Sequence, residues 1–130
     1  MNSVFLELAV IFALLLANKG YDAAASNYGM LPKDMDAALA GACPILGNYG
    51  AKDGQLKNAK FQLDESLTKL NVVHDIKMYP NSSHAFMNPK QGGGPIFGSL
   101  LRVTGAKPNP EDAKDAWLRI EEFFKEHLSA

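Results

Sequence analysis

The sequence predicts an α/β fold with about three mainly parallel strands and helices on both faces of the sheet. Short apolar runs alternate with segments of helical periodicity along the 130 residues. Strands that alternate with helices in this way are typically joined by right-handed crossovers and pair in parallel. A chain of this length can bury roughly two thirds of its unfolded surface, so we expect one domain, residues 1–130.

The charge balance and the cysteine content exclude several classes of function. The net charge is −1 and Lys and Arg form no cluster, so we expect neither a nucleic-acid partner nor binding to an acidic membrane. The one cysteine, Cys43, rules out an internal disulfide. It is compatible with a reducing compartment, and we expect a cytoplasmic protein.

The apolar segment at the amino terminus, residues 4–17, is predicted to be a buried helix, with a signal sequence as the alternative. Glu7 interrupts the run, no Lys or Arg precedes it, and no clear small-x-small cleavage site follows it. The run is also shorter than the roughly 20 residues that a membrane-spanning helix needs. Lys19 and Gly20 are suited to end a helix at this point.

Three apolar runs are predicted to be strands: residues 21–29, 43–49 and 72–78. The run 43–49 is nearly continuous, which is typical of a parallel strand covered on both faces. The run 72–78 alternates between apolar and polar residues. This alternation predicts one wetter face and a position near the edge of the sheet.

The helical segments between and after these runs are predicted from their periodicity and caps. Residues 31–39 favour a short helical turn closed by Gly41, and residues 56–70 an amphipathic helix. Asn109 is placed to cap a last helix that begins with Pro110. Its predicted buried stripe is Ala113, Ala116, Trp117, Ile120, Phe123 and Phe124. Residues 85–107 are irregular, with a short helical piece at 96–103, and loops of this length are usually functional or mobile.

An acid and a histidine follow two neighbouring predicted strands. Asp53 comes shortly after the run 43–49, and His84 comes shortly after the run 72–78. In open α/β sheets the chemistry lies at the carboxyl ends of the strands, so these residues suit two members of a nucleophile–base–acid triad. The structural alternatives are a turn or helix-cap role for Asp53 and a backbone-bonded loop histidine at His84.

No residue has the sequence context of the third member, the nucleophile. Cys43 stands before Pro44 at the beginning of the predicted strand 43–49, at the edge of the sheet opposite Asp53 and His84, where a buried structural thiol is expected. Ser82 and Ser83 adjoin His84, and neighbours on a tight turn favour hydroxyl-to-backbone bonds. Ser26 lies within a strand and is expected to be internal.

The remaining histidines and glycines predict no metal and no other cofactor. His74 is expected on a strand facing solvent and His127 at a helix end, and neither pairs with other ligands at metal spacing. Gly92, Gly93 and Gly94 do not open a helix after a strand, as a phosphate-binding loop must.

Four segments taken together resemble the dienelactone hydrolase family of the α/β-hydrolase superfamily: residues 21–29, 43–53, 74–88 and 113–128. By this resemblance Asp53 matches the triad acid and His84 the triad base, and the substrate is a carboxylic ester or a lactone. Family members carry their nucleophile on a Gly-x-Cys/Ser-x-Gly elbow, which this sequence does not contain. The resemblance therefore implies a truncated α/β-hydrolase-like fold that begins just after the nucleophile.

The resemblance leaves three functions open. The chain is a hydrolase of ester bonds whose nucleophile comes from a partner chain or from water, or a non-catalytic binding module, or a half that a partner polypeptide completes. In the family the strand in residues 23–28 would have a further neighbour. An unpaired edge and an apolar helix are both unfavourable in water, which predicts a homodimer.

Overall fold

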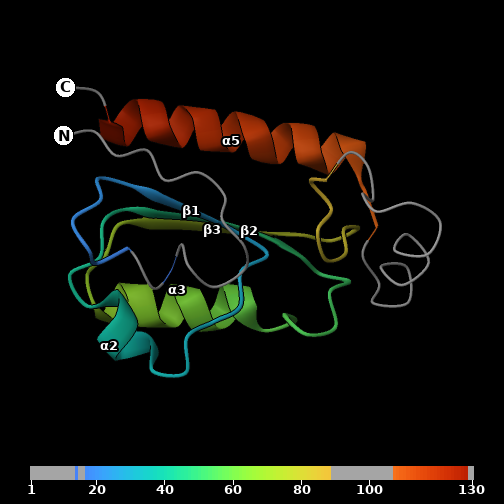
Figure 1. Cartoon of the computed structure of the whole chain (residues 1–130). Helices are drawn as coiled ribbons and strands as arrows, with labels where there is room; N and C mark the ends of the chain where they lie inside the picture. The colour runs from blue at the N-terminus through green and yellow to red at the C-terminus, as the bar shows by residue number, and fades with distance from the viewer. Residues whose placement is uncertain (1–13, 15–16, 89–106, 129–130) are drawn as a thin grey trace.

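The computed structural model describes residue 14, residues 17–88 and residues 107–128. Three strands form a parallel sheet in the order β1-β2-β3, with β1 at Ala24–Asn27, β2 at Ile45–Gly50 and β3 at His74–Tyr79. The helices within the described residues are α2 at Met35–Leu39, α3 at Ala59–Lys69 and α5 at Pro110–Leu128. Helix α3, with α2 beside it, lies against one face of the sheet and α5 against the other (Figure 1). The predicted fold class is confirmed.

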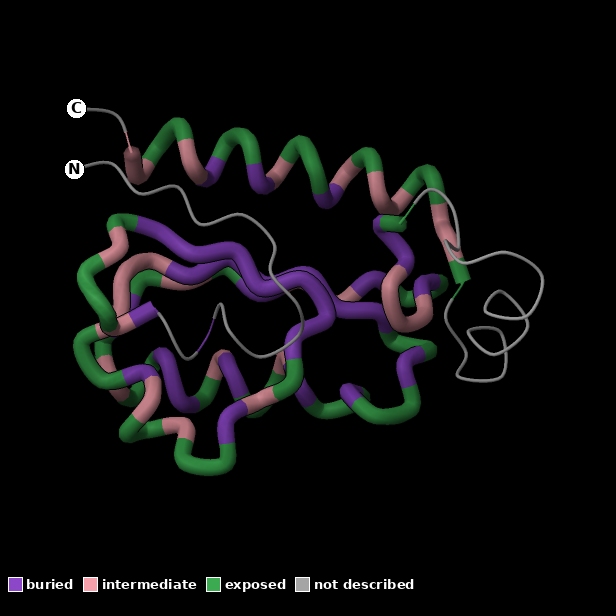
Figure 2. The backbone as a smooth tube through the Cα atoms, in the orientation of Figure 1, coloured by how far each residue is buried: buried purple, intermediate pink, exposed green. Residues whose placement is uncertain are grey.

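Burial along the strands follows the pattern expected of a parallel sheet. Every residue of β1 and of β2 is buried, as Figure 2 shows along the tube. Strand β3 is less buried and pairs only with β2 among the described strands: Ile76 and Tyr79 are buried, Asp75 is exposed and the other residues are partly buried. The predicted position of residues 72–78 at the edge is confirmed. The prediction of one wetter face is wrong, because each face of β3 carries one buried residue.

Helix α3 packs through one leucine face. Leu63 and Leu67 are fully buried, and Ala59 is 2% exposed. On the opposite side of the same helix Phe61 is 70% exposed. The amphipathic pattern that predicted this helix therefore identifies its core-facing side correctly.

Helix α5 begins as predicted, but its buried stripe is narrower. The side chain of Asn109 accepts a hydrogen bond from the Asp112 backbone N–H at 3.2 Å, which caps the helix. The buried residues of α5 are Ala116, Ile120 and Phe123. The prediction that Trp117 belongs to the core is wrong, since 41% of it is exposed. One residue step turns about 100° around a helix, which carries Trp117 past the sheet-facing stripe.

Polar side chains join α5 to all three strands. Arg119 donates a hydrogen bond to the side chain of Asn48 on β2, and its Nη2 lies 2.9 Å from Asp75 Oδ1 on β3. Asn48 Nδ2 in turn donates to Asn27 Oδ1 on β1 at 2.8 Å. Because buried amides are costly unless paired, these bonds help to fix the position of α5 on the sheet.

Two predicted elements fall largely outside the described residues. These are the helix at residues 4–17 and the helical piece at 96–103. Of the first segment, Leu14 and Ala17 are described, and both are buried. The Ala17 carbonyl accepts a hydrogen bond from the Cys43 N–H at 2.9 Å. None of the helices within the described ranges is long and apolar enough to cross a membrane.

Two substitutions on α3 test how the sheet and helix share the core. We expect Leu63→Ala to lower the free energy of unfolding by about 2–5 kcal/mol, because it leaves a cavity at a fully buried position. Phe61→Ala is the matched control and should change that free energy by no more than about 0.5 kcal/mol. Urea denaturation measures both, and equal effects at the two positions would contradict the packing.

Candidate active site

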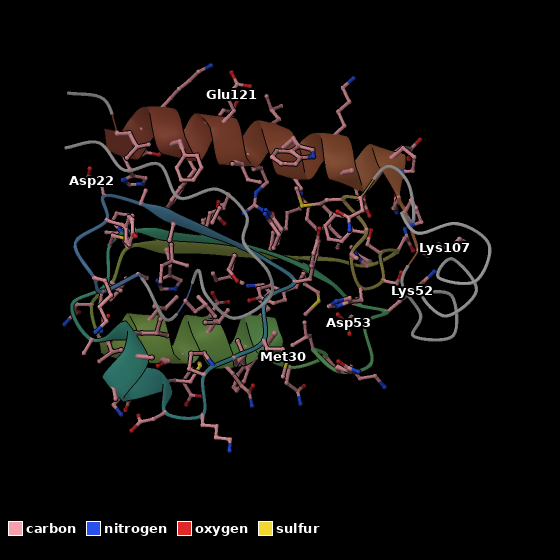
Figure 3. The ribbon with its side chains drawn as sticks, in the orientation of Figure 1. Asp22, Met30, Lys52, Asp53, Lys107 and Glu121 are labelled. Atoms are coloured by element: carbon pink, nitrogen blue, oxygen red, sulfur yellow. The ribbon has the colours of Figure 1, made fainter. Side chains whose placement is uncertain are left out.

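Asp53 and His84 lie together at the carboxyl edge of the sheet. His84 Nδ1 is 2.6 Å from Asp53 Oδ2, which is within hydrogen-bonding distance. Figure 3 shows Asp53 at the end of the molecule that lies far from Asp22, which precedes β1. An ionised carboxylate only accepts hydrogen bonds, so Nδ1 carries the proton and donates it, and Nε2 is left as the basic nitrogen.

Burial differs between the two partners in the sense that acid–base chemistry requires. The side chain of Asp53 is 3% exposed, whereas that of His84 is 31% exposed. A buried carboxylate paired with an accessible imidazole can orient the ring while the ring meets a reactant. The arrangement is that of a base supported by an acid.

Asp53 is also a turn residue, so its two sequence interpretations hold at once. Its Oδ1 accepts a hydrogen bond from the Gln55 N–H at 3.1 Å, while Oδ2 is bound to His84. Its backbone N–H donates to the Gly50 carbonyl at 3.1 Å. The turn thus holds the carboxylate from both sides and points its second oxygen at the imidazole.

The loop that carries His84 lies directly on the end of β2. The Lys52 N–H donates to the Ser82 carbonyl at 2.9 Å. A Cβ atom on Gly50 would lie 2.4 Å from that same carbonyl oxygen and 2.7 Å from that of Ser83. Only glycine permits this approach, so Gly50 sets the distance between the Asp53 turn and the His84 loop.

Ser82 fastens the same loop to the beginning of α5. Its hydroxyl donates to Asp112 Oδ2 at 2.6 Å, and Asn109 Nδ2 donates to the same oxygen at 2.9 Å. The expected hydroxyl-to-backbone bond is found instead at Ser83, whose Oγ donates to the Lys107 carbonyl at 3.3 Å. Both serines therefore hold structure around the histidine.

The other two nucleophile candidates are far from His84 or enclosed. Cys43 precedes β2, so a six-residue strand of roughly 20 Å separates it from the carboxyl edge. Its thiol is half-buried, and burial raises the pKa of this thiol to about 11. Ser26 is 2% exposed, as expected, and its hydroxyl is hydrogen-bonded to the Tyr49 hydroxyl at 3.1 Å.

An aromatic residue that was not predicted also contacts His84. Tyr28 follows β1 directly, and its ring centroid is 5.4 Å from that of His84. Its φ of +44° is a left-handed conformation, which costs a bulky residue about 1–3 kcal/mol. The available signal was its position, since it ends the first strand at the same edge of the sheet as Asp53 and His84.

The best-formed hollow near this edge of the sheet does not include the pair. It has a volume of about 430 Å³ and lies between the segment after β1 and the segment that leads into α3. Its lining includes Met30, Leu31 and Gly54, but neither Asp53 nor His84. Across the described residues, no group of three or more His, Cys, Asp or Glu side chains is placed to hold a metal ion. The predicted absence of a metal stays a prediction.

An open parallel sheet with an acid–histidine pair at its carboxyl edge is the architecture of an α/β-hydrolase. Comparison with known protein families gives the particular group. The model of the dienelactone hydrolase family matches residues 9–128, and the chain belongs to this family.

Similar proteins and a similar crystal structure agree with this assignment. Two proteins named "Putative carboxymethylenebutenolidase", from Saccharolobus solfataricus and Yersinia pestis, are 29% and 28% identical over 75% of this chain. They are matched over 33% and 32% of their own length, so the chain spans about a third of these relatives. A crystal structure titled "Putative Dienelactone Hydrolase" from Klebsiella pneumoniae aligns with a TM-score of 0.68 and 26% identity, covering 88% of this chain and 47% of that one.

Gly50→Ala tests the contact that sets the Asp53–His84 distance. We expect it to lower the free energy of unfolding by about 1–3 kcal/mol, because the added methyl group meets backbone atoms that cannot move aside cheaply. It should also lengthen the bond between Asp53 and His84, seen as loss of the His84 Hδ1 signal in proton NMR. Gly54→Ala is the matched control, since a Cβ there meets nothing within 4 Å; equal effects would refute the proposed role of Gly50.

Alkylation of Cys43 tests whether it is a structural thiol. With its pKa raised to about 11, the folded protein should react with iodoacetamide at pH 7.5 roughly 100-fold more slowly than the unfolded chain. The thiolate fraction grows as pH rises toward the raised pKa, so the rate should increase about tenfold per pH unit up to that value. A rapid reaction at neutral pH would instead identify Cys43 as an activated nucleophile.

Proposed function

We propose that this chain supplies the base and the acid of a site that hydrolyses a carboxylic ester or a lactone. The observation that carries the proposal is the 2.6 Å bond between buried Asp53 and accessible His84 at the carboxyl edge of the sheet. Membership of the dienelactone hydrolase family supports the substrate class.

His84 acts in this proposal as the general base and then as the general acid. Nε2 takes a proton from the attacking hydroxyl, thiol or water, whose heteroatom forms a bond to the carbonyl carbon. The tetrahedral intermediate then breaks the bond to the leaving oxygen, and the same proton passes from Nε2 to that oxygen. Where the nucleophile is a hydroxyl or thiol, water attacks the resulting acyl group in the same way: it gives a proton to Nε2, the bond from the acyl carbon to the nucleophile breaks, and that proton returns to the nucleophile. Asp53 holds the ring in one tautomer and stabilises the imidazolium formed between the two steps.

The nucleophile comes, in this proposal, from a partner chain or from water that His84 activates. The sequence contains no Gly-x-Cys/Ser-x-Gly elbow. In a Ser–His–Asp enzyme, removal of the nucleophile costs about 10⁶ in turnover, because the three groups act as a unit. Hydrolysis by water alone is accordingly expected to be slow.

A second candidate function is that of a part completed by another polypeptide. Three observations favour it: the chain spans about a third of its curated relatives, β1 is an edge strand of the described sheet, and buried Asn27 Nδ2 has no hydrogen-bond partner among the described residues. In this proposal the chain corresponds to the C-terminal part of the family fold.

We propose separately that two copies of the chain associate as a homodimer in the cytoplasm, because the edge strand β1 of the described sheet is unfavourable in water when unpaired. Light scattering at micromolar concentration should give twice the chain mass of 14.1 kDa, and a monomer would refute the homodimer.

Ester hydrolysis by the purified chain tests the principal proposal. We expect slow release of p-nitrophenol from p-nitrophenyl acetate, and opening of an unsaturated lactone, at rates above buffer. General acid–base catalysis typically contributes about 10²–10⁴-fold, so His84→Ala should lower the rate by about 10²-fold or more. Asp53→Asn should also lower it, because it removes the negative charge that stabilises the His84 imidazolium and fixes the tautomer with the proton on Nδ1.

His74→Ala is the matched control, since His74 lies on β3 with Nδ1 2.7 Å from the Val72 carbonyl and takes no part in the site. Hydrolysis that is absent, or indifferent to His84, would overturn the catalytic proposal. That result would favour the non-catalytic binding module instead.

A further inference from the structure

We propose that Tyr28 is the positioning residue for His84: its ring holds the imidazole in the orientation that keeps Nδ1 on Asp53 and Nε2 toward a reactant. The catalytic meaning of this inference rests on the proposed function. The geometric claim does not, because it concerns only how the histidine is held. Its test is therefore made without a substrate.

Aromatic contacts place the Tyr28 ring between His84 and the core. The two ring planes are tilted by 58° at a centroid distance of 5.4 Å, and Tyr28 meets Phe86 edge-on at 5.9 Å. Phe86 in turn packs on Tyr79 of β3 at 5.0 Å. Such tilted and edge-on pairs are the favoured arrangements of aromatic rings. The imidazole thus has a tyrosine ring beside it and Asp53 at its Nδ1, and Tyr28 itself is 8% exposed.

Tyr28 also contacts the far end of the turn that begins with His84. Its hydroxyl donates to Asn88 Oδ1 at 3.3 Å. The Asn88 N–H donates to the Ala85 carbonyl at 3.1 Å, and Ala85 has a φ of +58°. The five residues from His84 to Asn88 therefore form a turn with an unfavourable backbone conformation at its second residue, and one tyrosine contacts both of its ends.

The backbone conformation of Tyr28 is unfavourable for a bulky residue, which indicates that its side chain does more than fill space in the core. Its N–H donates to the Asn48 carbonyl at 2.7 Å, which extends the β1–β2 ladder past the last paired residues. The chain then turns with a φ of +44°, where glycine would be free of strain. Strained conformations persist where the surrounding structure uses them, and here the strain brings a bulky ring against the candidate base.

A histidine held by one hydrogen bond can still rotate about its side-chain torsions. A ring packed against one face restricts that rotation, so Nε2 keeps a single direction. Reacting groups must lie within a fraction of an ångström of their productive geometry, which makes such restriction valuable in a base.

Exchange of the His84 Nδ1 proton tests the inference. Proton NMR of the full chain labelled with ¹⁵N-histidine identifies the Hδ1 signal by its absence in His84→Ala. Tyr28→Gly removes the ring while suiting the positive φ, and should speed the exchange of this proton with water by about tenfold or more, since the bond to Asp53 opens more often. Tyr28→Phe keeps the ring and should stay within about twofold of the wild type.

Phe61→Ala, which removes an exposed aromatic ring from α3, should leave the exchange rate unchanged. If Tyr28→Gly does not fold, Tyr28→Leu keeps apolar volume without an aromatic ring and should again speed the exchange. An unchanged rate in the ring-deleted variant, or a rate in Tyr28→Phe as fast as in that variant, would overturn the inference. The absence of ester hydrolysis would refute the proposed function and leave this result standing.

Discussion

The register between β2 and β3 is the constraint on which the candidate site depends. Ile45 pairs with His74 and Gly50 with Tyr79, so the two strands begin and end level. The loops that follow them therefore leave the sheet side by side, and the Ala51 N–H continues the ladder to the Tyr79 carbonyl at 2.9 Å. A slip of one residue would move one loop by about 3.3 Å and turn its side chains to the other face.

The fold follows from local patterns in the sequence because parallel α/β units leave strong ones. The apolar run before Asp53 and the alternating run before His84 predict strands, and the leucine face that includes Leu63 predicts the helix that joins them. Once two strands are assigned to a parallel sheet, their carboxyl ends lie at one edge by topology alone. Topology thus places Asp53 and His84 at the same edge. That they act as a pair was expected only from the resemblance to the dienelactone hydrolase family, since the residues alone equally allow a turn or cap role for Asp53 and a backbone-bonded His84.

The parts of the site that escaped prediction depend on contacts between distant segments. In the sequence Gly50 cannot be distinguished from any other glycine at the end of a strand. Its importance comes from the His84 loop, whose backbone packs directly against it. The bond from Ser82 to Asp112 joins residues 30 positions apart, and no local pattern announces it. The prediction that Trp117 is buried was wrong for a related reason. The width of the buried stripe of a helix depends on what the helix packs against, and α5 contacts the sheet partly through the polar side chain of Arg119.

The pairing of Asp53 with His84 also bears on how the chain acquires its structure. The two residues are 31 positions apart, and the segment between them holds α3 and β3. Their bond can form only after one complete strand–helix–strand unit has closed, a non-local event that loop entropy makes slow compared with helix formation. We therefore expect the bond between His84 and Asp53 to form late in folding. The His84 Hδ1 proton, which reports on the site, then also reports on the assembly of the β2–α3–β3 unit.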